Sequence, residues 1–198
     1  MKAALLKMAG GFSFLKKNQK NAMNKYTKLF SFLLGIWLFS ACSGHQLKGY
    51  EIDGSATLPE FEGKMVYMKD VLTDQPIDSA KIINGKFAFA DTATIAMPVV
   101  RILSIPADKM GLEYRLPVVI ENATIQASIS AVVCTKGTML NERMQDFLMS
   151  VDEYSTSCTG KQAEQIKSGF SDLLNKYIEI NKDNAVGEYI QTAYRSSL

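Results

Sequence analysis

The hydrophobic pattern of this chain changes its period once, near Gly137, and this change determines the fold class. Between Tyr50 and Cys134, short apolar or alternating runs are separated by turn residues, as is typical of β-strands. After Gly137, apolar residues recur at the three- and four-residue spacing of amphipathic helices. The sequence therefore predicts an α+β protein: an antiparallel β sandwich or open barrel of about seven strands over residues 50–136, then two to three α-helices over residues 137–198.

The clearest local signal is Asn84-Gly85, which separates two strand-like runs at 77–83 and 86–90. Both central residues of a type I′ turn need a positive φ, and the pair Asn-Gly adopts it readily. Joined by turns of this kind, the strands predict an antiparallel meander. The other strand-like runs are 50–56, 64–69, 98–105, 116–121, 124–129 and 131–134.

Three helices are expected in the second part of the chain. The first covers residues 141–153, where apolar side chains have helical spacing. Thr159 and Gln162 have the spacing of a capping box, which predicts the start of the second helix. Asp183 or Asn184 caps a short third helix. We expect part of its apolar face to stay exposed and this helix to be the least stable element of the fold.

Charge is unevenly distributed along the chain. Residues 1–41 contain seven of the 22 basic residues and none of the 20 acidic ones, so residues 42–198 carry a net charge of −5. Nucleic-acid binding depends on the neutralisation of phosphates by basic side chains. A mildly acidic body therefore predicts no nucleic-acid partner.

The N-terminal segment has the layout of a secretory signal. Residues 29–41 form an uncharged apolar run, too short for the about 20 residues that span a bilayer, and basic residues precede it. The segment from Phe39 to Cys42 resembles a bacterial lipobox, in which the chain is cut before a cysteine that is then lipidated. We therefore expect residues 1–41 to be a signal region, Cys42 to be the lipidation site and residues 42–49 to be a tether.

The same segment supports a location as well as an anchor. The stretch that begins at Met23 already has the usual length of a lipoprotein signal, so Met23 is the expected true start. Lipidation at Cys42 predicts an outer-membrane lipoprotein of the cell envelope, facing the periplasm or the cell surface. Two alternatives stay open: an ordinary cleaved signal with an incidental cysteine, and an uncut membrane anchor.

Few residues beyond Cys42 have the chemistry of a catalytic site. His45 is the only histidine, and the sequence contains no CxxC, zinc-hydrolase, serine-hydrolase or phosphate-loop motif. We therefore expect no catalytic residue, no cofactor and no metal site. Cys134 and Cys158 are the remaining thiols. The sequence leaves open whether they form a disulfide in an oxidising envelope or whether Cys134 is simply a small buried side chain.

Several short motifs occur along the chain in an order typical of one family. The motifs are Tyr50-x-Ile52-x-Gly54, Val66-Tyr67, Ile77-Asp78-Ser79-Ala80, Asn84-Gly85-Lys86-Phe87, Pro117 to Asn122, Gly137-Thr138-x-Leu140-Asn141 and Lys182 to Tyr189. With these motifs, about residues 48–195 resemble domain-of-unknown-function family 4369. In many envelope thiol–disulfide oxidoreductases this domain and a helical segment precede a thioredoxin-like domain that carries CxxC. The catalytic cysteines of those enzymes have no counterpart here.

Together the residues and the resemblance predict a lipid-anchored, non-catalytic envelope lipoprotein that binds a partner or ligand. The resemblance implies a thioredoxin-like protein or another envelope protein as the partner, in addition to the membrane that holds the lipid. One alternative is a truncated or split thiol–disulfide oxidoreductase whose redox domain is missing from this reading frame. A second alternative is a structural cell-surface lipoprotein.

Overall fold

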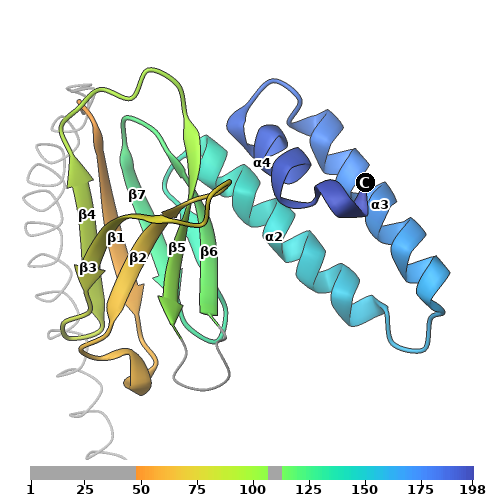
Figure 1. Cartoon of the computed structure of the whole chain (residues 1–198), viewed down its shortest axis with the longest axis horizontal. Helices are drawn as coiled ribbons and strands as arrows, with labels where there is room; N and C mark the ends of the chain where they lie inside the picture. Colours follow the sequence, from red (N-terminus) through yellow and green to blue (C-terminus); the bar gives the residue numbers. More distant parts are fainter. Residues whose placement is uncertain (1–47, 107–112) are drawn as a thin grey trace, which may run out of the picture. The chain divides into compact units, whose positions relative to one another are not determined.

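Two four-stranded sheets pack face to face in the computed structural model, which describes residues 48–106 and 113–198 (Figure 1). The first sheet has the strand order β4-β1-β7-β8, and the second has the order β3-β2-β5-β6. The predicted signal region and Cys42 lie outside the described residues. The strands are β1 (Tyr50–Ala56), β2 (Met65–Asp70), β3 (Pro76–Lys81), β4 (Lys86–Asp91), β5 (Val99–Pro106), β6 (Glu113–Ile120), β7 (Thr124–Ile129) and β8 (Cys134–Lys136).

The sandwich and the α+β class are confirmed, but the antiparallel meander is wrong. β1 pairs with β4 in antiparallel orientation and with β7 in parallel orientation, so Asp53 lies between Ala88 and Gln126. The consecutive strands β3 and β4 belong to different sheets. By crossing between the sheets, the chain lets both layers bury one apolar face in a shared core.

The turn at Asn84-Gly85 is confirmed, with φ angles of 53° and 68°. Ile83 N donates to the carbonyl of Lys86 at 2.9 Å, and Lys86 N donates back at 3.1 Å. This pair is an isolated bridge, because the strands on its two sides then diverge into different sheets. The carboxylate of Glu62 accepts hydrogen bonds from the backbone N–H groups of Asn84 and Gly85, both at 3.0 Å. The turn between β3 and β4, where the chain passes from one sheet to the other, is therefore hydrogen-bonded to the loop before β2.

The last strand starts later than predicted. Residues 130–132 form a bend, residue 133 is irregular, and β8 begins at Cys134. The hydroxyl of Ser130 donates to the carbonyl of Val132 at 2.7 Å and accepts from its N–H at 3.3 Å. These local hydrogen bonds compete with strand pairing, so the pairing of β7 with β8 begins only at Cys134.

Apolar side chains fill the space between the two sheets. Phe61, Leu103 and Ile125 are fully buried there, and each such side chain contributes about 1.5–3 kcal/mol by its removal from water. The ring of Phe87 lies directly over Gly54, where an added Cβ would be only 2.2 Å from its Cε2. This close approach is why β1 carries a glycine in the middle of the sheet.

Three helices follow the strands, and two of them pack directly against the second sheet (Figure 1). Val100 and Val119 point outward from β5 and β6 and join Phe147 and Leu174 of the helices in a second core. Parts of β5 and β6 are therefore buried on both faces, which explains the unbroken apolar stretch at 116–120 of β6. The helices are α2 (Met139–Ser157), α3 (Ala163–Ile180) and α4 (Ala185–Ala193), and short 3-10 turns lie at Pro59–Phe61 and Arg195–Ser197.

The N-terminal cap of α3, the second helix expected from the sequence, differs from the prediction. Gln162 and Gln165 form the capping box of α3, in which Gln162 N donates to Gln165 Oε1 at 3.1 Å. Thr159 lies in the loop instead, because α2 continues four residues beyond its predicted end at 153. The third helix is capped by Asn184, whose Oδ1 accepts from Val186 N at 2.9 Å.

The expectation of a partly exposed third helix is corrected by the structure. Val186 and Ile190 of α4 are fully buried, and Tyr189 is 9% exposed. A Cβ at Gly187 would lie 2.2 Å from the carbonyl oxygen of Asn181, so α4 packs directly on the end of α3. The apolar face of α4 is covered by β5, α2 and α3, which the sequence pattern of one helix could not reveal.

Asn141 joins the first helix to both sheets. Its Oδ1 accepts from Val119 N at 2.9 Å and from Thr135 Oγ1 at 2.7 Å, and its Nδ2 donates to Val119 O at 2.8 Å and to Thr138 Oγ1 at 2.9 Å. β6 is an edge strand, and the amide of Asn141 pairs with its free edge as a neighbouring strand would. The buried amide is thereby fully hydrogen-bonded, as buried polar groups must be.

Candidate functional site

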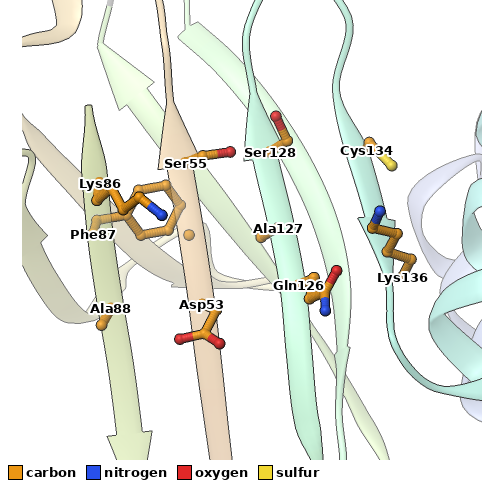
Figure 2. Close-up of a pocket in the computed structure, with 11 residues that line it drawn as sticks. Asp53, Ser55, Lys86, Phe87, Ala88, Gln126, Ala127, Ser128, Cys134 and Lys136 are labelled. Atoms are coloured by element: carbon orange, nitrogen blue, oxygen red, sulfur yellow. The ribbon is translucent and has the colours of Figure 1, made fainter. Parts of the chain in front are cut away.

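A hollow of about 770 Å³ lies on the outer face of the first sheet, away from the core (Figure 2). Side chains alternate between the two faces of a strand, so every second residue of the four adjacent strands points toward this surface. Eight of the residues that line the hollow point outward in this way, and we call them the outer polar face. They are Asp53, Ser55, Lys86, Ala88, Gln126, Ser128, Cys134 and Lys136.

The strand register arranges the outer polar face in two rows. One row crosses the sheet as Lys86, Ser55, Ser128 and Cys134, and the other as Ala88, Asp53, Gln126 and Lys136. Neighbouring strands are about 4.8 Å apart, and alternate residues of a strand about 6.8 Å, so the Cα atoms of the two lysines lie about 16 Å apart at opposite corners. Small side chains occupy most of the space between these corners.

The polar groups of this face are unpaired within the part of the chain that the structure describes. There, the side chains of Asp53, Lys86, Gln126 and Lys136 make no hydrogen bond or ion pair, and neither do the hydroxyl groups of Ser55 and Ser128. A ligand can therefore bind to them without breaking an internal contact of the described domain.

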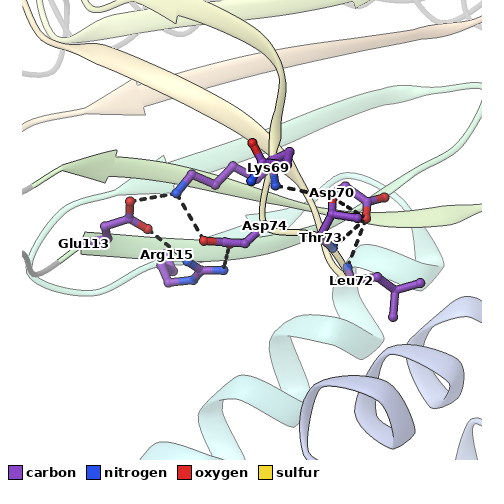
Figure 3. Close-up of polar contacts among 8 residues, drawn as sticks. Lys69, Asp70, Leu72, Thr73, Asp74, Glu113 and Arg115 are labelled. Atoms are coloured by element: carbon purple, nitrogen blue, oxygen red, sulfur yellow. Dashed lines mark hydrogen bonds and ion pairs between the residues drawn. The ribbon is translucent and has the colours of Figure 1, made fainter.

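The charged side chains of the second sheet behave differently (Figure 3). Lys69 Nζ lies 2.7 Å from Glu113 Oε1 and 3.5 Å from Asp74 Oδ2. Arg115 bridges the same two acids, at 2.7 Å to Asp74 Oδ1 and 2.9 Å to Glu113 Oε2. These four residues, the charged cluster, hold the β2–β3 turn against β6.

Two aspartates of this region have lowered pKa values. Hydrogen bonds from the backbone of Thr73 and Leu72 to Asp70, helped by the nearby charge of Arg101, lower the pKa of Asp70 below its ordinary value of 3.8. The hydrogen bond from Arg115 lowers the pKa of Asp74 in the same way. Both shifts follow from stabilisation of the charged carboxylate by hydrogen bonds and nearby basic side chains.

The structure does not bring together the two cysteines whose pairing the sequence left open. Cys134 is half-buried in the hollow, Cys158 is half-buried at the end of α2, and both thiols are free. Thr135 N donates to Gln145 Oε1 at 2.9 Å, which places β8 beside the middle of α2. Cys158 lies 13 residues further along, about 20 Å at the rise of a helix, whereas the Cα atoms of a disulfide lie within about 7 Å.

A second, more apolar hollow of about 660 Å³ lies between the ends of α2 and α3. The rings of Tyr154 and Phe170 stack there with their centroids 5.8 Å apart. The hydroxyl of Tyr154 donates to the carbonyl of Ile166 at 2.7 Å, so its polar group is already satisfied. This hollow is a seam between two packed helices.

Sequence patterns alone did not single out the outer polar face. Asp53 and Glu51 lie two residues apart on β1, and within a single strand such a pair of acids indicates only a solvent-exposed face. Its neighbours Lys86 and Gln126 come from strands that are distant in the sequence, and only the register brings them beside it. Lys136 lies beyond the predicted last strand. The only available signal was the alternation of polar and apolar residues within each run.

In residues 48–106 and 113–198, no group of three or more His, Cys, Asp or Glu residues is placed to hold a metal ion. None of the helices in this part of the protein is long and apolar enough to cross a membrane.

Residues 50–144 match the model of a protein family described as "Domain of unknown function (DUF4369)". The match confirms the family resemblance over these residues, and the motif at Lys182 to Tyr189 lies beyond it. It covers both sheets and continues into the first turns of α2, where Asn141 connects that helix to β6. A comparison with curated proteins finds no match.

Proposed function

We propose that this chain, whose residues 50–144 match the DUF4369 family model, is a lipid-anchored lipoprotein of the cell envelope that binds a partner. The outer polar face of the first sheet is the binding surface in this proposal. The observation that carries it is that this face gathers two amines, a carboxylate, an amide and two hydroxyls without internal partners among the described residues.

The anchor is supported by the sequence of the N-terminal segment. An uncharged apolar run at 29–41 ends in Ser40-Ala41 directly before Cys42. Each buried CH₂ of an acyl chain contributes about 0.8 kcal/mol to membrane binding, and two or more chains hold a protein stably. The proposed location is the outer membrane, with the domain facing the periplasm or the cell surface.

A binding role, rather than a catalytic one, is supported by the chemistry of the hollow. A nucleophile needs an adjacent base within hydrogen-bond reach, and neither Ser55, Ser128 nor Cys134 has such a contact among the described residues. The only histidine of the sequence, His45, precedes the domain. An envelope protein fits best as the partner, and a thioredoxin-like protein is the candidate that the family resemblance supplies.

Metabolic labelling tests the anchor. Cells that produce the wild-type chain are grown with labelled palmitate, and the Cys42→Ala variant is the matched control. We expect label on the wild type and none on the variant. Equal labelling of the two proteins would contradict lipidation at Cys42.

Alkylation of Cys134 tests the binding surface without knowledge of the partner. N-ethylmaleimide is applied to isolated envelopes and to the purified full-length chain, and mass spectrometry follows the two free thiols separately. We expect Cys134 to react at least fivefold more slowly in envelopes, whereas Cys158 reacts equally in both and gives the internal reference. The same rate for Cys134 in both samples would contradict a covered outer polar face.

A further inference from the structure

We infer that the outer polar face binds an extended peptide segment of a partner protein that has a carboxylate near each end and an ammonium group between them. This inference rests on the proposed function and specifies the chemistry of the partner. It follows from the signs and positions of the three charged side chains that line the hollow, Lys86, Asp53 and Lys136.

The order of the charges across the sheet is positive, negative, positive. Lys86 lies on the edge strand β4, Asp53 on the neighbouring strand β1, and Lys136 on the opposite edge strand β8. From the strand spacings, the Cα of Asp53 is about 8 Å from that of Lys86 and about 10 Å from that of Lys136. A ligand that satisfies all three groups therefore has the order negative, positive, negative.

The distance between the lysines sets the length of the ligand. An extended chain spans at most about 3.3–3.6 Å per residue, so about five residues cover the 16 Å diagonal. The hollow of about 770 Å³ is floored by the short side chains of Ser55, Ala88 and Ser128. Short side chains let a peptide backbone lie close to the sheet, where the two hydroxyls and the amide of Gln126 can donate and accept hydrogen bonds.

The same groups disfavour other classes of ligand. The carboxylate of Asp53 repels a uniformly acidic peptide or a polyphosphate at the centre of the hollow. An apolar ligand would bury the unpaired charged and hydroxyl groups of the hollow without giving them partners, which is unfavourable. The central acid thus provides the selectivity, and the two lysines provide the attraction.

Binding of synthetic peptides to the purified full-length chain tests this inference. The probe has five residues, with glutamates at both ends, a lysine in the centre and serines between, and both termini are blocked. The control peptide has the signs reversed. By calorimetry at low salt, we expect the probe to bind at least tenfold more tightly than the control, and added salt to weaken it because these pairs are exposed. Equal affinities would overturn the inference.

Charge-reversal variants locate the binding. Lys86→Glu and Lys136→Glu should each weaken the probe about tenfold. Lys81→Glu is the matched control, because Lys81 is an equally exposed lysine on the edge strand β3 of the other sheet. Asp53→Asn should strengthen the binding of a uniformly acidic peptide. If Lys81→Glu weakened the probe as much as Lys86→Glu, the binding would be unspecific and the inference wrong.

The failure of this inference differs from a failure of the proposed function. If Cys134 is protected in envelopes but the probe neither binds nor slows its alkylation, the surface has a partner of another chemistry and only the peptide inference fails. If Cys134 is equally reactive in envelopes and in the purified chain, the proposed binding surface fails as well.

Discussion

The two sheets of this protein use charged residues in opposite ways. On the second sheet, Lys69 and Arg115 are held by Asp74 and Glu113, so these charges neutralise one another at short distances. On the outer polar face of the first sheet, Lys86 has no such partner among the described residues. Residue types of the same kind therefore serve structure in one place and are free for binding in the other. The difference lies in the partners that the register supplies.

The charged cluster also shows what internal pairing achieves locally. Asp74 has a positive φ of 56° in the β2–β3 turn, a conformation that aspartate tolerates better than most residues. Its carboxylate meets Arg115 of β6, and Asp70 accepts from the N–H groups of Leu72 and Thr73 in the same turn. The turn is thus held both by its own backbone and by a neighbouring strand. In contrast, nothing in the outer polar face requires its charged side chains for folding.

The largest effect on stability is expected where a paired polar group is also buried. Asn141→Leu removes four hydrogen bonds and leaves the N–H and carbonyl groups of Val119 buried without that partner. We expect the free energy of unfolding, measured in urea, to fall by about 2–4 kcal/mol. Gln126→Ala removes an unpaired amide from the outer polar face and is the control, with an expected change within about 0.5 kcal/mol. A change as small for Asn141→Leu would show that the buried amide does not hold the helix to the sheets.

A smaller effect on stability should distinguish a lysine of the charged cluster from a lysine of the outer polar face. Lys69→Met removes two ion pairs from the charged cluster, and the side chain of Lys69 is only 11% exposed. We expect this variant to lose about 1 kcal/mol of unfolding free energy, whereas Lys86→Met changes it by less than about 0.5 kcal/mol. Thermal unfolding of both variants at equal ionic strength makes the comparison. The opposite order would mean that the outer polar face, too, is a structural contact.

Acidification should reveal the role of Asp70 and Asp74 through a still smaller change in stability. The pKa values of Asp70 and Asp74 are lower in the folded chain than their ordinary value of 3.8, so the folded state binds fewer protons than the unfolded state. Their contribution to stability is therefore fully present above about pH 4 and is lost as the pH falls through the folded pKa values. We expect the melting temperature of Asp74→Asn, which retains a residue suited to positive φ, to fall less between pH 5 and pH 3 than that of the wild type. A curve for Asp74→Asn as steep as that of the wild type would contradict the assignment.

Local features of the fold could be predicted from the sequence, because they depend on residues close together in the chain. The bounds of β1 and β7 agree with the predicted runs, and Asn84-Gly85 forms the predicted turn. The cap at Asn184 follows the same rule, since its side chain bonds to a backbone group two residues later. These elements required no knowledge of the rest of the molecule.

Features that depend on distant partners could not be predicted. The parallel pairing of β1 with β7 sets Asp53 beside Gln126, and no local pattern indicates it. Strand order likewise decides whether a lysine is paired or free. Lys69 of β2 reaches Glu113 of β6 across β5, which lies between these two strands in the sheet. The covered face of α4 has the same origin. The candidate site was therefore invisible in the sequence, although each of its strands was expected, β8 with bounds that begin too early.

The most direct test combines charge reversal with the envelope measurement. The Lys86→Glu/Lys136→Glu double variant is produced in cells, and the alkylation rate of Cys134 is measured in isolated envelopes beside wild type and Lys81→Glu. Because the two lysines make no internal contact among the described residues, the double variant should unfold at the wild-type temperature. We predict that Cys134 becomes as reactive in envelopes as in the purified chain for the double variant alone. Unchanged protection of Cys134 in that variant would contradict a partner held by the charges of the outer polar face.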